Sequence, residues 1–152
     1  GTLHVEAGDY LTAKPYFETL FRMDPAAPAT RGMLATWHAS YAKSLAEAGD
    51  LGAAIAACEA GLATLPDSAA ILETLGRLQL AGSEPRQAIA SFAAAARSEP
   101  DNVAIALLLA STLLDQGEAE AARQALRQAL LRARQRGDRN AQQRFEAILG
   151  RI

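Results

Sequence analysis

A spacing of 34 residues recurs along this sequence and constrains its fold more than any other feature. Ala54, Ala88 and Ala122 stand 34 residues apart, and so do Pro66 and Pro100. A period of this length is typical of chains in which each repeat is one helical hairpin, too thin to bury its apolar face alone. The sequence therefore predicts hairpins that are stacked on one another.

Each repeat carries the same sequence of structural signals. A glycine in a left-handed conformation ends one helix, a polar side chain caps the next helix, and a proline ends that helix. Between cap and proline, a small alanine allows the paired helices to approach, and a bulky residue one turn later fills the gap between units. The expected glycines are Gly8, Gly49, Gly82 and Gly117; the caps are Asp9, Asp50 and Ser83; the alanines are Ala13, Ala54, Ala88 and Ala122; the bulky residues are Phe17, Cys58, Phe92 and Leu126; the prolines are Pro25, Pro66 and Pro100.

The composition favours helix throughout. Half of the residues are apolar but only 5% are aromatic, and the apolar residues are mainly alanine and leucine. These side chains lose little conformational freedom in a helix, whereas β-branched and aromatic residues are too sparse for a sheet. We therefore expect an all-α fold.

The pattern resembles the tetratricopeptide repeat family in its period, loop glycine, small alanine, bulky residue and terminal proline, and in the pair Leu75-Gly76. The resemblance implies a right-handed α-solenoid of about three and a half to four helix pairs. The first helix of each pair would line a concave groove that binds peptides or partner helices. The expected units are residues 1–27, 28–68, 69–102 and 103–136, followed by a capping helix over 138–150.

Several departures from the pattern carry their own predictions. The first unit lacks most of its first helix, so we expect the sequence to be a segment of a larger protein. Extra residues before the second unit predict a long helix from Thr30 to Ala48. Arg134 replaces the fourth proline, which predicts a helix that continues to Arg136. Beyond it, Asp138 can cap a last helix with one apolar stripe: Ala141, Phe145, Ile148, Leu149 and Ile152.

The resemblance also implies which residues face the groove, each placed by its offset from its own loop. The groove would carry mixed charge in its N-terminal half and apolar side chains in its C-terminal half. Burial under a neighbouring helix is an equal alternative for the leucines, and burial in the core competes with an anchor role for the tryptophan. The expected partner-binding residues are Thr36, Trp37, Ser40, Lys43, Glu47, Glu73, Arg77, Leu80, Leu107, Ser111, Leu114 and Asp115. With Lys43 and Arg77 as the cationic side chains, a clamp for a terminal carboxylate is not expected.

Other functional classes find little support. His4 and His38 are the only histidines and Cys58 is the only cysteine, so we expect no metal site, no cofactor and no catalytic residue. A net charge of −2 attracts neither nucleic acid nor an anionic membrane. No apolar run approaches the roughly 20 residues that span a bilayer.

The leading hypothesis is a non-catalytic interaction module for a protein or peptide, in a soluble, cytoplasmic or periplasmic setting. Self-association into a homo-oligomer is one alternative. It draws on an apolar side of the 10–24 helix and on the charge contrast between residues 1–122, with 7 basic and 15 acidic side chains, and residues 123–152, with 8 basic and 2 acidic. The second alternative is that this chain is a repeat domain appended to an enzyme whose catalytic part lies elsewhere.

Overall fold

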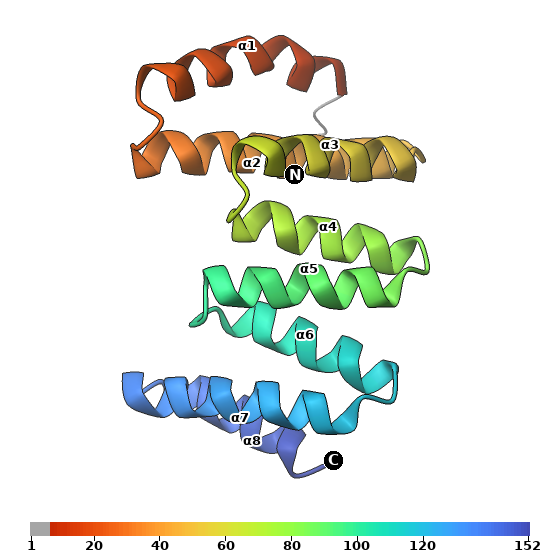
Figure 1. Ribbon diagram of the computed structural model, residues 1–152, viewed down its shortest axis with the longest axis vertical. Coiled ribbons are helices and arrows are strands. Elements are labelled where there is room, and N and C mark those ends of the chain that lie inside the picture. Colours follow the sequence, from red (N-terminus) through yellow and green to blue (C-terminus); the bar gives the residue numbers. More distant parts are fainter. Residues whose placement is uncertain (1–6) are drawn as a thin grey trace.

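The computed structural model describes residues 7–152, which form eight α-helices and no strand. The helices are stacked along the long axis of the molecule (Figure 1). Their bounds are α1 (Ala7–Met23), α2 (Pro28–Glu47), α3 (Leu51–Thr64), α4 (Ala69–Ala81), α5 (Pro85–Ser98), α6 (Val103–Asp115), α7 (Ala119–Arg136) and α8 (Arg139–Leu149). This arrangement confirms the all-α repeat solenoid that the sequence predicted.

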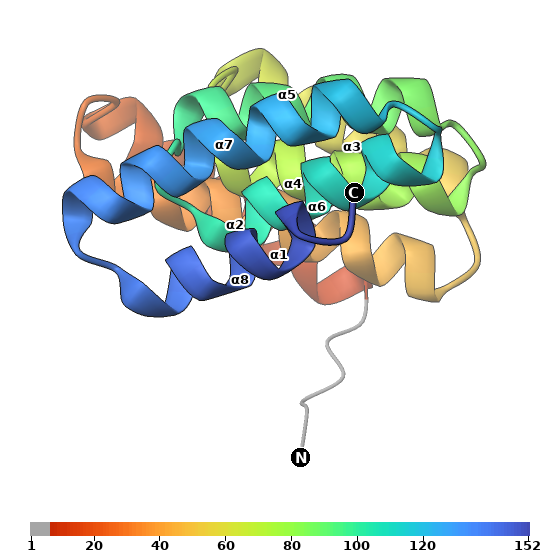
Figure 2. The same cartoon turned by 90° about the horizontal axis from the view of Figure 1, so that it is seen from below.

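Packing follows the order of the chain. The helices α3, α5 and α7 form one layer, and α2, α4, α6 and α8 form the other (Figure 2). Each helix of the first layer packs between two neighbours: α3 between α2 and α4, α5 between α4 and α6, and α7 between α6 and α8. The first helix, α1, packs mainly against α2.

Small residues let the paired helices approach closely, as the repeat pattern predicted. Ala54, Ala88 and Ala122 are each 0% exposed. The closest approach is between α4 and α5, where a methyl group added at Gly76 would lie 2.5 Å from the ring of Phe92. Because such interiors are packed as densely as crystals, neither a larger nor a smaller side chain fits here without cost.

Side-chain caps begin four of the helices. The side chains of Asp50, Ser68, Asn102 and Asp138 each accept a hydrogen bond from the backbone N–H three residues later. A cap of this kind stabilises a protein by about 1 kcal/mol. The caps at Asp50 and Asp138 were predicted from the sequence.

Two other predicted caps are wrong. Asp9 lies inside α1, because the helix already begins at Ala7. Ser83 has a φ of 59° and occupies the left-handed position, while Glu84 precedes the helix without a side-chain cap. Ser83 stands 34 residues from Gly49 and from Gly117, whose φ values are 90° and 76°. The 34-residue period therefore places Ser83 at the left-handed position that glycine occupies in the other two loops. The sequence alignment had assigned this position to the neighbouring Gly82 instead.

The long helices differ little from the expected bounds. Instead of running from Thr30 to Ala48, α2 runs from Pro28 to Glu47, because proline suits the first helical turn, where its missing N–H costs nothing. As predicted, α7 continues to Arg136, and a left-handed Gly137 with a φ of 70° ends it. The stripe of the last helix packs onto the C-terminal core, with Phe145 only 1% exposed.

Replacing Ser83 with glycine should stabilise the protein. A side chain in the left-handed region strains the backbone, and glycine removes that strain, so we expect the free energy of unfolding to rise by about 0.5–1 kcal/mol. Chemical denaturation measures the change. The control Ser111→Gly, inside α6, should instead lower stability by about 0.5 kcal/mol. Equal effects of the two substitutions would contradict the strain assigned to Ser83.

Replacing Ala88 with leucine should overpack the contact between α5 and its neighbours. We expect the free energy of unfolding to fall by about 1–3 kcal/mol. The matched control is Ala90→Leu on the exposed face of the same helix, which should leave stability nearly unchanged. Thermal melting of both variants tests the expectation, and a stable Ala88→Leu variant would mean that the unit alignment is wrong.

Candidate functional site

A cavity of about 760 Å³ lies between α1 and α2 at the N-terminal end of the stack. We call it the end cavity. Its walls come from one face of each helix. The lining residues are Asp9, Tyr10, Ala13 and Phe17 of α1, and Ala29, Gly32, Met33, Thr36, Trp37 and Ser40 of α2.

The aromatic wall of the end cavity is held in place. Trp37 is 6% exposed, and its indole N–H donates a hydrogen bond to the backbone carbonyl of Tyr10 at 2.9 Å. Its ring stacks on Tyr41 with centroids 5.4 Å apart and lies 6.5 Å from the ring of Phe17. The tryptophan is thus mainly a core residue, with one edge available to the cavity.

The floor of the end cavity is made of small residues. A Cβ added at Gly32 would meet nothing within 4 Å, and Ala13 and Ala29 also line the space. Met33 is 42% exposed at its edge. Asp9 is the one charged side chain among the lining residues. The cavity therefore suits an apolar ligand surface that brings its own bulky side chains.

A second hollow of about 410 Å³ lies between the starts of α2 and α4. Gly32 and Thr36 line both spaces, and Ala70 and Glu99 also line the second one. The two hollows therefore adjoin at Gly32 and Thr36 of α2.

Of the twelve residues expected to bind a partner, Thr36, Trp37 and Ser40 line the end cavity. The acidic and basic candidates lie elsewhere. Lys43 and Glu47 are exposed on α2. On α4, Glu73 and Arg77 form an ion pair with 3.1 Å between Oε1 and Nη2, so each partly neutralises the other.

The remaining candidates lie along α4 and α6. Leu80 is 39% exposed, and Leu114 is half-buried. Leu107 is half-buried and packs against the C-terminal core, as the burial alternative for the leucines anticipated. Ser111 and Asp115 are exposed, and the Ser111 hydroxyl donates to the carbonyl of Leu108.

Sequence reasoning missed most of the end cavity. Tyr10, Ala13, Gly32 and Met33 were not among the expected binding residues. The signal was nevertheless present, because a first unit without most of its first helix must leave the small and bulky positions of α1 uncovered. Ala13 and Phe17 are half-buried, whereas their counterparts in later units are fully buried.

The histidine and cysteine that the structure describes have structural environments. Burial lowers the pKa of His38, with a further contribution from nearby Lys14, and its ring meets Trp37 edge-on at 4.7 Å. Burial raises the pKa of Cys58 to about 11, so the thiol stays protonated at neutral pH. Within residues 7–152, no three metal-ligating side chains gather in one place. His4 lies outside the described residues.

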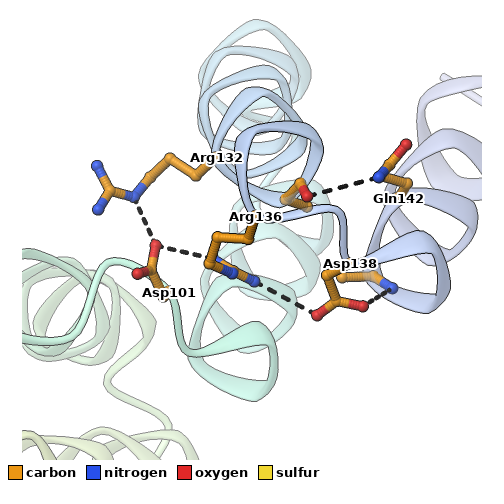
Figure 3. Close-up of polar contacts among 7 residues, drawn as sticks. Asp101, Arg132, Arg136, Asp138 and Gln142 are labelled. Atoms are coloured by element: carbon orange, nitrogen blue, oxygen red, sulfur yellow. Dashed lines mark hydrogen bonds and ion pairs between the residues drawn. The ribbon is translucent and has the colours of Figure 1, made fainter.

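The basic C-terminal segment uses several arginines within the fold (Figure 3). Asp101, in the loop before α6, accepts from Arg132 at 2.9 Å and pairs with Arg136 at 2.7 Å. The hydrogen bond from Arg132 holds the pKa of Asp101 below its usual range, and Arg136 adds to the effect. Arg136 also meets Asp138, the cap of α8. These pairs tie the last two helices to the preceding loop.

None of the helices in the described range combines the length and apolar character that crossing a membrane requires.

The comparisons with known proteins agree with this fold. The tetratricopeptide repeat model matches residues 1–69 and 73–141. The translocator chaperone SycD of type III secretion, from Yersinia enterocolitica, superposes with a TM-score of 0.63 at 19% identity, over 88% of this chain and 97% of that one. MamA from Desulfovibrio magneticus RS-1 superposes with a TM-score of 0.56 at 16% identity, over 84% of this chain and 68% of that one.

YrrB, described as a tetratricopeptide repeat protein with an unusual peptide-binding site, gives a TM-score of 0.56 at 18% identity. It aligns with 75% of this chain and 55% of its own. The sequence has no significant match among curated proteins. With a family model that matches most of its length, and with hairpins stacked as that family requires, the chain belongs to the tetratricopeptide repeat family.

Proposed function

We propose that this chain is a non-catalytic module that binds a peptide or a partner helix of another protein. The observation that carries the proposal is the apolar end cavity, which opens beside a row of first helices on an otherwise well-packed stack. A rigid surface of this kind loses little conformational entropy when it binds. An amphipathic helix laid into an apolar groove is a common mode of peptide recognition.

Similar proteins support the proposal at the level of the fold. SycD is described as a chaperone and YrrB as having a peptide-binding site. Repeats of stacked hairpins present extended inner surfaces to their partners. We extend this property to the inner face that α2, α4 and α6 form in the present chain.

Charged side chains along the inner face would select the partner. Lys43 and Glu47 on α2, with Glu73 and Arg77 on α4, are the residues that we assign to specificity. Affinity would come from apolar contacts, because burying apolar surface releases more free energy than an exposed ion pair does. Leu80 on α4 and Leu114 on α6 offer such contacts.

Exchanging Glu73 and Arg77 tests this assignment. The double variant Glu73→Arg/Arg77→Glu keeps an ion pair on α4 but reverses the charge at each position, so the fold should be preserved. Peptides selected against the unaltered chain from a displayed library should bind the variant about two- to tenfold more weakly in calorimetric titration. Gln87→Glu/Arg86→Gln on the exposed face of α5 is the control. Unchanged binding by the exchange variant would contradict the role of these residues.

Self-association is the second candidate, because α1 exposes apolar side chains. Leu11 is 53% exposed, Tyr16 62% and Met23 77%. Sedimentation velocity over a range of protein and salt concentrations distinguishes the two: a dimer that Tyr16→Ser dissociates supports self-association, and a concentration-independent monomer removes it. Leu131→Ser, at an exposed leucine of α7, is the matched control.

A further inference from the structure

We propose that the chain also binds a small organic carboxylate with an apolar body, in a cavity of about 560 Å³ between α1, α2 and α3. We call this space the α1–α3 cavity. Its lining includes His38 of α2 together with Lys14 and Arg22 of α1. It shares no lining residue with the end cavity, and the inference goes beyond the proposed function because its ligand is a small molecule.

The imidazole of His38 is the polar group that points to a ligand. The residue is only 9% exposed, and it lines the α1–α3 cavity. Within residues 7–152 it has no hydrogen-bond or ion-pair partner, and no side-chain nitrogen or oxygen that is sealed from solvent lacks a partner. The ring nitrogens of His38 are therefore accessible from the cavity. Because buried polar groups normally have hydrogen-bond partners, a polar group of a ligand would complete this site.

The packing of the ring fixes the direction of its nitrogens. The ring of His38 meets Trp37 edge-on with centroids 4.7 Å apart. On the α3 side it lies against Gly61, where an added Cβ would be 2.8 Å from Cγ of the histidine. These contacts hold the imidazole in one place, so a ligand would lose little free energy in ordering it.

The repeat shows that packing alone does not call for polar side chains at this place. The positions one and two repeat lengths after His38 carry apolar residues, and so do the two positions that correspond to Lys14. The counterparts are Leu72 and Ala106 for the histidine, and Ile55 and Ile89 for the lysine. Apolar side chains thus satisfy the interface between units, and the first interface replaces two of them with polar groups that line one cavity.

The α1–α3 cavity has a polar end and an apolar end. The helices α1 and α2 run antiparallel (Figure 1), so Phe21 and Leu34 lie nearer to the connecting loop than Lys14 and His38 do. Phe21, Leu34 and Pro25 supply the apolar lining. The volume is within the range of small-molecule sites. A ligand with one polar head and an apolar body matches this order of side chains.

Charge favours an anionic head. The charged lining residues are Lys14, Glu18 and Arg22. Nζ of Lys14 lies 3.7 Å from Oε1 of Glu18, so these two charges partly offset each other. Arg22 forms no ion pair in the described part of the chain, and it leaves the lining with an excess of positive charge. A carboxylate would accept a hydrogen bond from the imidazole N–H of His38, and the ammonium group of Lys14 would attract it.

Octanoate is a suitable probe, because it carries one carboxylate on an unbranched apolar chain. We expect saturable binding to the unaltered chain in calorimetric titration. Octanol and octylamine, with the same chain but a neutral or positive head, should bind about tenfold more weakly. Acetate, which lacks the apolar body, should also bind about tenfold more weakly or less. Octylamine that binds as tightly as octanoate would overturn the anionic head.

His38→Leu tests the polar end. The variant has the residue type of its counterpart Leu72, so the helices should stay folded, which circular dichroism checks. We expect octanoate to bind about tenfold more weakly, while octanol binds as before. A histidine that serves packing alone would give the opposite result: the variant would lose stability, and its preference for octanoate over octanol would not change.

Arg22→Gln tests the excess charge. We expect octanoate to bind about two- to fivefold more weakly at low salt, because the guanidinium is exposed and partly screened. The matched control is Arg97→Gln, which removes an exposed arginine from the last turn of α5 and lies outside the cavity. Equal effects of the two substitutions would contradict a role for Arg22 at this site.

Protonation of His38 gives a second measurement. Burial lowers the pKa of His38, Lys14 of α1 lowers it further, and Glu18 of α1 opposes this effect. The lining residues of α3 are uncharged. A bound carboxylate favours the imidazolium form, so octanoate should raise the pKa of His38. By the same linkage, affinity should rise as the pH falls from about 8 to about 6.

Nuclear magnetic resonance measures this shift directly. The imidazole signals that are missing from the spectrum of the His38→Leu variant identify His38. Saturating octanoate should move the midpoint of their titration to higher pH. A midpoint that does not move would overturn the contact between the carboxylate and the imidazole.

The outcomes separate this inference from the proposed function. Absence of saturable octanoate binding overturns the inference. Binding that His38→Leu and Arg22→Gln leave unchanged also overturns it, because the ligand would then lie elsewhere, as in the end cavity. Loss of octanoate in His38→Leu, with library peptides still bound, supports the α1–α3 cavity. If no library peptide binds while octanoate still does, the proposed function fails and this site stands.

Discussion

The close approach of two helices at a small residue is the contact on which the rest of this fold depends. It brings the bulky side chain of one helix against the backbone of the next, as with Phe92 and Gly76. Each contact buries one hairpin face and leaves the opposite face exposed until the next hairpin covers it. The stack therefore gains stability with each added unit.

The first and last described helices are covered to different degrees. At the C-terminus, α8 covers the last hairpin, with Phe145 buried and its cap tied by Arg136 to Asp101. Arg132, Arg134 and Arg136 are the basic side chains whose ion pairs hold the last two helices and the preceding loop together. At the N-terminus, α1 lies over α2 with Phe17 half-buried, and apolar surface remains open. Contacts that cover this apolar surface would gain free energy by burial.

The sequence was sufficient to predict the repeat, the helix order and the closing helix, because a period of 34 and a small residue at Ala88 leave few other ways to pack. Local details failed where two signals competed. Gly82 suggested a left-handed loop position, but the period places Ser83 there. Trp37 was named as a partner-binding residue with burial in the core as the alternative, and its indole bond to Tyr10 holds it in the core. The repeat pattern marked Ala13 and Phe17 on α1, but it did not show the space beside them, because that depends on how the neighbouring helices pack.

The extent of burial indicates which of the two candidate surfaces, the charged inner face or the apolar end cavity, would contribute more to affinity. The Glu73–Arg77 pair is exposed on α4, and exposed pairs contribute about 0–1 kcal/mol. Burial of apolar surface is worth about 25 cal/mol per Å², so a helix face that covers Phe17, Met33 and the edge of Trp37 would gain several times more. In the proposed function, the charges along the inner face would therefore discriminate between partners, while the apolar surface beside α1 would provide most of the affinity. Specificity and affinity would then belong to different surfaces of the stack, whose two neighbouring hollows share Gly32 and Thr36 in their linings.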